Sequence, residues 1–306
     1  MFSDTHCHLK HISERGENLQ ALVALLDAEK YRFILDIGTK PGDLASRVET
    51  VLKATAENTN LESFARIPSF IHFTAGLWPD AEVIAEREDS LRALEADVKE
   101  MLALASRRAD AGCEQFAALG ECGLDRYWNG EAAAVRELAG ENGGEDGPGT
   151  TDVAGEEELF GMQLDMAKRY DLPVIIHSRD AFDATLGCIK NSSFDSGVIH
   201  CFSYGTKEAR AFLDRGWLIS FPGNVTWPKK AEDRERVASL VKYVPRDRLL
   251  LETDAPYLTP APHRGKTNTP YLVRHVYERV AECLEISPES LAEIVFENAR
   301  SLFRVR

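Results

Sequence analysis

The chain has 306 residues, of which 44% are hydrophobic, 28% charged and 8% aromatic. This composition is typical of a globular protein and excludes collagen-like, low-complexity and wholly disordered chains. The 36 basic and 50 acidic residues give a net charge of −14, which argues against a protein that coats duplex DNA by neutralising its phosphates. The charge still allows an enzyme that handles phosphate inside one pocket, because a metal ion can supply local positive charge there.

The N-terminal sequence MFSDTHCHLKHIS has no basic region and no long apolar run, and no stretch of the chain approaches the ~20 apolar residues of a membrane span. We therefore expect a cytoplasmic protein that does not bind membranes. The six cysteines form no C-x-x-C pair, so we expect thiols rather than a disulfide framework. No obligatory protein partner is expected, and a monomer is the default.

Eight short apolar runs are predicted as strands, and amphipathic segments predicted as helices alternate with them. The predicted strands cover 2–4, 32–37, 69–74, 115–120, 173–176, 197–199, 217–220 and 248–251. The predicted helices include 18–29, 43–57, 81–108, 156–170, 230–241, 269–284 and a last one from Ser287-Pro288 to about 303. This alternation favours right-handed βαβ units and predicts an α/β fold of the (β/α)8 TIM barrel class with C-terminal helices. A doubly wound open sheet is less favoured, because no G-x-G-x-x-G follows the first strand.

One acidic segment interrupts this alternation. Residues 131–165 contain ten acids and one base, Arg136, and therefore carry a net charge of −9. The middle of the segment is rich in glycine and nearly free of apolar residues, so it buries too little surface to offset its ordering entropy. We predict that 1–306 form a single barrel and that 131–158 are a flexible acidic insertion after the fourth strand, which would repel long polyanions.

Metal-competent side chains end or closely follow five of the predicted strands. The carboxyl ends of barrel strands meet at one mouth, where active sites lie. Four imidazoles and two carboxylates exceed the ligands of one tetrahedral cation, which favours two divalent ions: Zn or Mn, with Mg as a further candidate. Glu121, with two oxygens, is the candidate bridge. The six residues are His6, His8, Glu121, His177, His200 and Asp254.

The motifs DTHCHL, GECGLDRYW, LPVIIHSRDA, GVIHCFS and LLLETDAPYLTPAPHRGKTN resemble, in the same order, the motif series of the TatD family of metal-dependent deoxyribonucleases. The resemblance implies a metal-dependent barrel of the amidohydrolase type that hydrolyses nucleic-acid phosphodiester bonds, in some members from the 3′ end of single strands. It also implies that Asp254 orients or deprotonates the attacking water. The implied ligands of one ion are His6, His8, Glu121 and Asp254, and those of the other are Glu121, His177 and His200.

Five further residues are predicted to contact substrate. Arg179 and Arg264 are candidates for bidentate contacts with phosphate oxygens. Trp78, Ser203 and Tyr257 lie in segments expected at strand ends. Bases stacked on the aromatic rings of Trp78 and Tyr257 would gain ~1–3 kcal/mol each. Trp78 departs from the family pattern, because the sequence Gly-Leu-Trp-Pro stands where the family usually shows Gly-x-His-Pro.

The expected function is therefore a metal-dependent nuclease that cleaves DNA at single-stranded or 3′ ends, with Asp254 and Glu121 as catalytic residues. The alternative is a hydrolase of the same fold that acts on an ester or amide, such as an aminoacyl-tRNA linkage or a small molecule. Trp78 and the acidic segment keep this alternative open. A non-catalytic scaffold is less favoured, since six ligands around two ions leave open coordination positions.

Overall fold

The computed structural model describes residues 1–55, 67–108, 116–139 and 149–305. Eight strands form one sheet in the order β1 to β8, and every neighbouring pair is parallel. They are β1 (Ser3–Cys7), β2 (Phe33–Asp36), β3 (Ile71–Ala75), β4 (Phe116–Asp125), β5 (Val174–Arg179), β6 (Gly197–Ile199), β7 (Leu218–Phe221) and β8 (Leu249–Leu251). The predicted (β/α)8 TIM barrel is confirmed.

The barrel is closed between its first strand and the segment after its last. Cys7 and Ala255 form a parallel bridge, and the His8 amide donates to the Ala255 carbonyl at 2.7 Å. The Asp254 amide donates to the His6 carbonyl at 2.9 Å. Three of the predicted site residues therefore lie at this closing seam.

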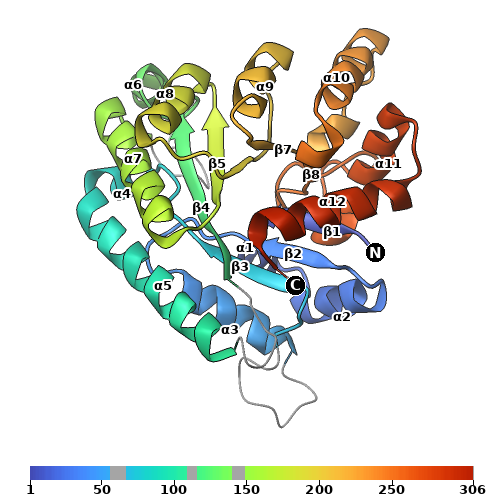
Figure 1. The fold of residues 1–306 in the computed structure, drawn as a ribbon, viewed down its shortest axis with the longest axis horizontal. Coiled ribbons are helices and arrows are strands. Elements are labelled where there is room, and N and C mark those ends of the chain that lie inside the picture. Colours follow the sequence, from blue (N-terminus) through green and yellow to red (C-terminus); the bar gives the residue numbers. More distant parts are fainter. Residues whose placement is uncertain (56–66, 109–115, 140–148, 306) are drawn as a thin grey trace.

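Helices cover the outside of the strands (Figure 1). The longer ones such as α12 bury an apolar stripe, and several begin at a side-chain cap, as Ser287 does by accepting a hydrogen bond from the Ser290 amide. They are α1 (Leu9–Glu14), α2 (Leu19–Ala28), α3 (Leu44–Thr55), α4 (Ala81–Ala85), α5 (Arg87–Arg108), α6 (Glu131–Ala139), α7 (Val153–Tyr170), α8 (Phe182–Ser192), α9 (Thr206–Leu213), α10 (Ala231–Tyr243), α11 (Val273–Leu284) and α12 (Pro288–Phe303). Short 3-10 turns cover Gly223–Thr226, Arg246–Arg248 and Pro270–Leu272.

β4 and β5 are longer than predicted. The sequence pattern ended these strands before Glu121 and at Ile176, whereas β4 continues to Asp125 and β5 to Arg179. The extension depends on Gly123, whose φ of +143° favours glycine and where a Cβ atom would overlap the His177 carbonyl oxygen. Glu121 and His177 therefore lie within paired strands rather than in loops.

The prediction of a flexible segment over 131–158 is wrong at both ends, because α6 covers 131–139 and α7 begins at 153. Asp152 caps α7 by accepting from the Gly155 amide at 2.9 Å. Glu156 is fully buried, and its Oε1 accepts from the Asp125 amide and from Asn129 Nδ2, each at 2.8 Å. Acidity here thus partly serves hydrogen bonding within the fold. Residues 140–148 lie outside the described residues.

Five cysteines are described, and all are free thiols, as predicted: Cys7, Cys122, Cys188, Cys201 and Cys283. Cys113 lies outside the described residues. Among the helices of the described ranges, none has both the length and the apolar character needed to cross a membrane.

Candidate metal centre

The six predicted ligands converge at one end of the barrel. Their side-chain nitrogen and oxygen atoms form three overlapping groups of three residues. In each group the three candidate ligand atoms lie within 4.8 Å of one another. These groups are His6–His8–Glu121, His6–His200–Asp254 and Glu121–His177–His200. The strands that supply the residues are far apart in sequence, so the sheet order alone brings them together.

Glu121 occupies the middle of the cluster and divides it into two halves. Its Oε2 lies 3.2 Å from His6 Nε2 and 4.0 Å from His8 Nε2. Its Oε1 lies 2.9 Å from both His177 Nδ1 and His200 Nε2. One carboxylate thus faces two pairs of imidazoles, which is the geometry that a bridging ligand requires.

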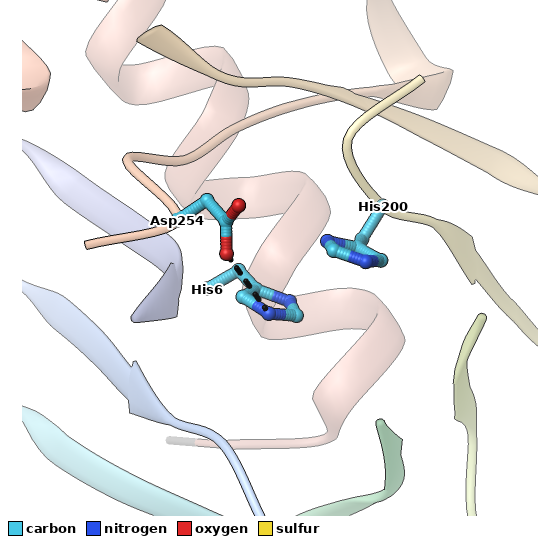
Figure 2. Close-up of side chains that lie close together, drawn as sticks. All are labelled: His6, His200 and Asp254. Carbon is cyan, nitrogen blue, oxygen red and sulfur yellow. Dashed lines mark ion pairs between the residues drawn. The ribbon is translucent and has the colours of Figure 1, made fainter. Parts of the chain in front are cut away.

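Asp254 faces the first half of the cluster. Its Oδ1 lies 3.7 Å from the Nε2 atoms of both His6 and His8. Figure 2 shows Asp254 pointing toward His6, with His200 beside them. The rings of His6 and His200 stack at 4.0 Å between centroids and 9° between planes. The side chain of Asp254 is 15% exposed and that of Glu121 is 5% exposed, so Asp254 is the carboxylate more open to solvent.

The charges in the second half of the cluster are strongly coupled. Burial alone would raise the pKa of Glu121, but its interactions with His200, His177 and His6 hold that pKa well below its ordinary value. Burial opposes protonation of His177, yet hydrogen bonds to Asp125 and Glu121 raise its pKa to about 9. Glu121 also raises the pKa of His200 well above its ordinary value, against the effect of burial.

The ring nitrogens that face away from the cluster have different partners. His8 Nδ1 lies 3.3 Å from the Ile37 carbonyl oxygen. His177 Nε2 lies 2.8 Å from Asp125 Oδ2, and His200 Nδ1 lies 3.6 Å from Glu252 Oε1. Sequence reasoning missed both carboxylates.

A signal for Asp125 was present in the sequence. Asp125 lies four residues after Glu121 on the same strand, and Glu252 lies two residues before Asp254. Even spacing along extended chain puts side chains on the same face. The spacing could therefore have placed Asp125 on the same side of β4 as Glu121, whereas Asp254 has a φ of +56° and the rule does not reach Glu252.

The residues present fit a divalent cation. His6 is fully buried, and neither of its ring nitrogens has a hydrogen-bond partner among the described residues. Buried polar atoms are nearly always bonded, so a ring nitrogen aimed at Glu121 and Asp254 is better explained as a metal ligand. Four imidazoles and two carboxylates are also a donor set suited to Zn or Mn.

Three of the predicted substrate-binding residues lie next to the cluster or on a loop joined to it. The Trp78 ring packs edge-on to the His177 ring at 5.9 Å, and the Tyr257 ring packs edge-on to the His8 ring at 6.0 Å. Arg179 follows His177 by two residues at the end of β5, and its guanidinium lies 3.8 Å from the centroid of Tyr127.

The other two are not joined to the cluster. The Arg264 guanidinium lies over Trp227, 4.4 Å from the ring centroid, and Ser203 is exposed in the loop after β6. Within the described ranges, no hydrogen bond, ion pair or ring contact links either residue to the six clustered side chains.

The family model described as TatD related DNase matches residues 3–304. The chain is 31% identical over 307 residues to the Bacillus subtilis protein named uncharacterized metal-dependent hydrolase YabD, with all of both chains covered. It is 33% identical over 242 residues to the 3'-5' ssDNA/RNA exonuclease TatD of a Rahnella species, covering 77% of this chain and 78% of that one. The crystal structure of YJJV, a TatD homologue from Escherichia coli, matches with a TM-score of 0.69 at 26% identity, covering 100% of this chain and 98% of that one. The chain therefore belongs to the TatD related DNase family and is a metal-dependent hydrolase.

Proposed function

We propose that this protein is a nuclease that hydrolyses phosphodiester bonds at single-stranded or 3′ ends of DNA, with two divalent cations held by the six clustered residues. The observation that carries the proposal is the position of Glu121, whose two oxygens face two different pairs of histidines. Two cations a few ångströms apart suit the displacement of an oxygen at phosphorus. The similarity to a relative named as a 3'-5' ssDNA/RNA exonuclease supports this class of substrate.

In this proposal His6, His8, Glu121 and Asp254 hold one cation, and Glu121, His177 and His200 hold the other. When bound, the cations would neutralise charge on the phosphate oxygens and make a water acidic enough to attack near neutral pH. Asp254 would orient that water and accept its proton, because its carboxylate is more exposed to solvent than that of Glu121 and reaches toward both His6 and His8.

The substrate strand would lie over the loops that surround the cluster. Arg179 would bind phosphate oxygens, since a guanidinium offers two parallel donors to an oxyanion. Trp78 and Tyr257 would stack against bases beside His177 and His8. Ser203 and Arg264 remain substrate contacts predicted from sequence.

Trp78 favours one second candidate. An indole stands beside His177 at the position where the family usually has a histidine, so no imidazole at this position can bind phosphate or donate a proton. An ester or amide substrate, such as an aminoacyl-tRNA linkage or a small molecule, carries less negative charge at the reacting centre. Such a substrate would depend less on that lost imidazole.

The test compares wild-type protein with His200→Ala, each supplied with Mn²⁺ or Zn²⁺. The substrates are 3′-labelled single-stranded DNA, 3′-labelled duplex DNA and aminoacyl-tRNA. We expect the wild type to release labelled nucleotide from single-stranded DNA fastest, and His200→Ala to release little. Equal release by both proteins would contradict the proposal, and deacylation of the tRNA without nucleotide release would favour the second candidate.

A further inference from the structure

Asp125, at the end of β4, uses both of its carboxylate oxygens as hydrogen-bond acceptors. Its Oδ2 lies 2.8 Å from His177 Nε2. Its Oδ1 accepts from the backbone amides of Tyr127 at 2.9 Å and Trp128 at 3.0 Å. Asp125 is fully buried, so these contacts are shielded from water.

An ionised carboxylate can only accept hydrogen bonds, so its contact with His177 requires a proton on Nε2. The two backbone amides that bond to Oδ1 require that oxygen to be an acceptor, and the ionised carboxylate is the form in which both oxygens accept. In a neutral imidazole with Nε2 protonated, the lone pair is on Nδ1. Nδ1 is the atom that lies 2.9 Å from Glu121 Oε1 and 3.2 Å from His200 Nε2.

We propose that Asp125 is a positioning residue of the metal centre, which holds the proton on His177 Nε2 and so makes Nδ1 the nitrogen that gives up its proton to a cation. Partners of this kind orient metal-binding histidines and increase their basicity. The inference rests on the proposed metal-dependent function and adds to it a residue that does not itself touch a cation.

The same carboxylate also positions the substrate side of the centre. The loop that Asp125 caps carries Tyr127, and the guanidinium groups of Arg179 and Arg136 lie 3.8 and 4.4 Å from the centroid of its ring. Arg179 is the candidate phosphate ligand. Asp125 therefore joins the ligand His177 to the loop on which that arginine rests.

Asp125→Asn is a sharp test because asparagine has almost the same shape but only one acceptor atom. If its oxygen stays with the amides of Tyr127 and Trp128, its NH₂ group points at His177 Nε2. The neutral ring must then protonate Nδ1 and loses its ligand lone pair. If the side chain turns over, its NH₂ group faces two amide donors and the loop loses its cap.

The experiment is calorimetric titration of the metal-free protein with Zn²⁺. We expect Asp125→Asn to weaken one zinc site by about 10- to 100-fold. Asp125→Ala, a second variant that brings no new donor, should also weaken it. The matched control is Asp80→Asn, because Asp80 caps α4 through the Val83 amide at 2.9 Å and touches no histidine in the described residues. It should bind zinc as the wild type does.

A thermodynamic cycle separates positioning from general destabilisation. If Asp125 acts through His177, then adding Asp125→Asn to His177→Ala should change zinc affinity less than about threefold. Unchanged zinc affinity in the single Asp125→Asn variant, or the same loss with and without His177, would overturn the inference and leave the metal centre in place. Wild-type protein that binds neither Zn²⁺ nor Mn²⁺ would overturn both the proposed function and this inference.

Discussion

The two halves of the cluster are supported by buried carboxylates in different ways. In the half made by β1 and the segment after β8, the carboxylates bind backbone. Asp4 accepts from the amides of Thr253 at 2.9 Å and His6 at 3.2 Å, and Asp36 accepts from the Leu9 amide at 2.7 Å. These bonds fix the backbone at Thr253, which precedes Asp254, at His6 itself, and at Leu9, which follows His8.

In the half made by β4, β5 and β6, the carboxylates face the imidazole rings themselves. Asp125 bonds to the ring of His177, and Glu252 lies 3.6 Å from the ring of His200 while accepting from the Cys201 amide at 2.5 Å. Loss of a backbone-holding carboxylate should therefore mainly reduce stability, whereas loss of a ring-facing one should mainly reduce metal affinity.

The largest effect is expected at the residue that both halves share. Glu121→Gln keeps the shape of the side chain and removes its negative charge, so neither half retains the carboxylate that faces its histidines. A bound metal contributes several kcal/mol to catalysis, which corresponds to a loss of about 10³-fold in rate. The measurement is nuclease activity together with the zinc content of the purified variant. If Glu121→Gln binds two zinc ions and cleaves at the wild-type rate, Glu121 does not link the two halves of the cluster.

Asp36→Ala tests the backbone-holding carboxylates. Asp36 Oδ2 accepts from Arg47 Nη1 at 2.6 Å, and both residues are buried, so the substitution removes one of the two carboxylates that pair with this guanidinium, the other being Asp43. Removal of one partner of a buried ion pair costs about 3–5 kcal/mol of unfolding free energy. Urea denaturation measures this loss, with Glu49→Ala as a control in an exposed ion pair with Lys53, which should change stability little. A small loss in Asp36→Ala would contradict the structural role assigned to this half.

Glu252→Gln tests the ring-facing carboxylates. Glutamine retains an acceptor for the Cys201 amide but removes the charge beside His200 Nδ1. We expect zinc affinity to fall about tenfold, with a smaller change in stability than in Asp36→Ala. Glu208→Gln is the matched control, because Glu208 in α9 is half-buried, accepts from the Gly205 amide at 3.1 Å and does not belong to the cluster. Equal zinc affinity in the Glu252→Gln and Glu208→Gln variants would show that the contact with His200 has no energetic role.

Zinc binding in the half of the cluster that contains His177 should depend on pH. Because the pKa of His177 is about 9, a cation must displace a proton from it at lower pH. Zinc affinity should therefore rise with pH up to about 9, by at most about tenfold per pH unit for one proton. In the metal-free protein the sign is opposite: the stability gained from protonated His177 is present below pH 6.5 and is lost toward pH 9. Titrations between pH 6 and 9 measure both slopes, and His177→Ala should reduce them, leaving the contribution of His200.

Much of the architecture follows from local patterns. The runs at 197–199 and 248–251 are apolar and short, and they form β6 (Gly197–Ile199) and β8 (Leu249–Leu251) as predicted. The order of the strands then brings six ionisable side chains to one mouth. Their roles as metal ligands and as catalytic groups stay predictions. Short polar helices such as α6 and α9 were missed, because their sequences lack a long apolar stripe.

What the sequence by itself determined is the number of strands, their alternation with helices and the kinds of side chain at their ends. β-branched apolar runs and alternating side-chain directions are properties of the local chain. Only the tertiary structure decided that Glu121 faces two pairs of histidines, that Asp125 and Glu252 lie behind His177 and His200, and that Arg264 rests on Trp227. The physical reason is that each of these contacts joins segments far apart in the chain, and its distance depends on how strands and loops pack together.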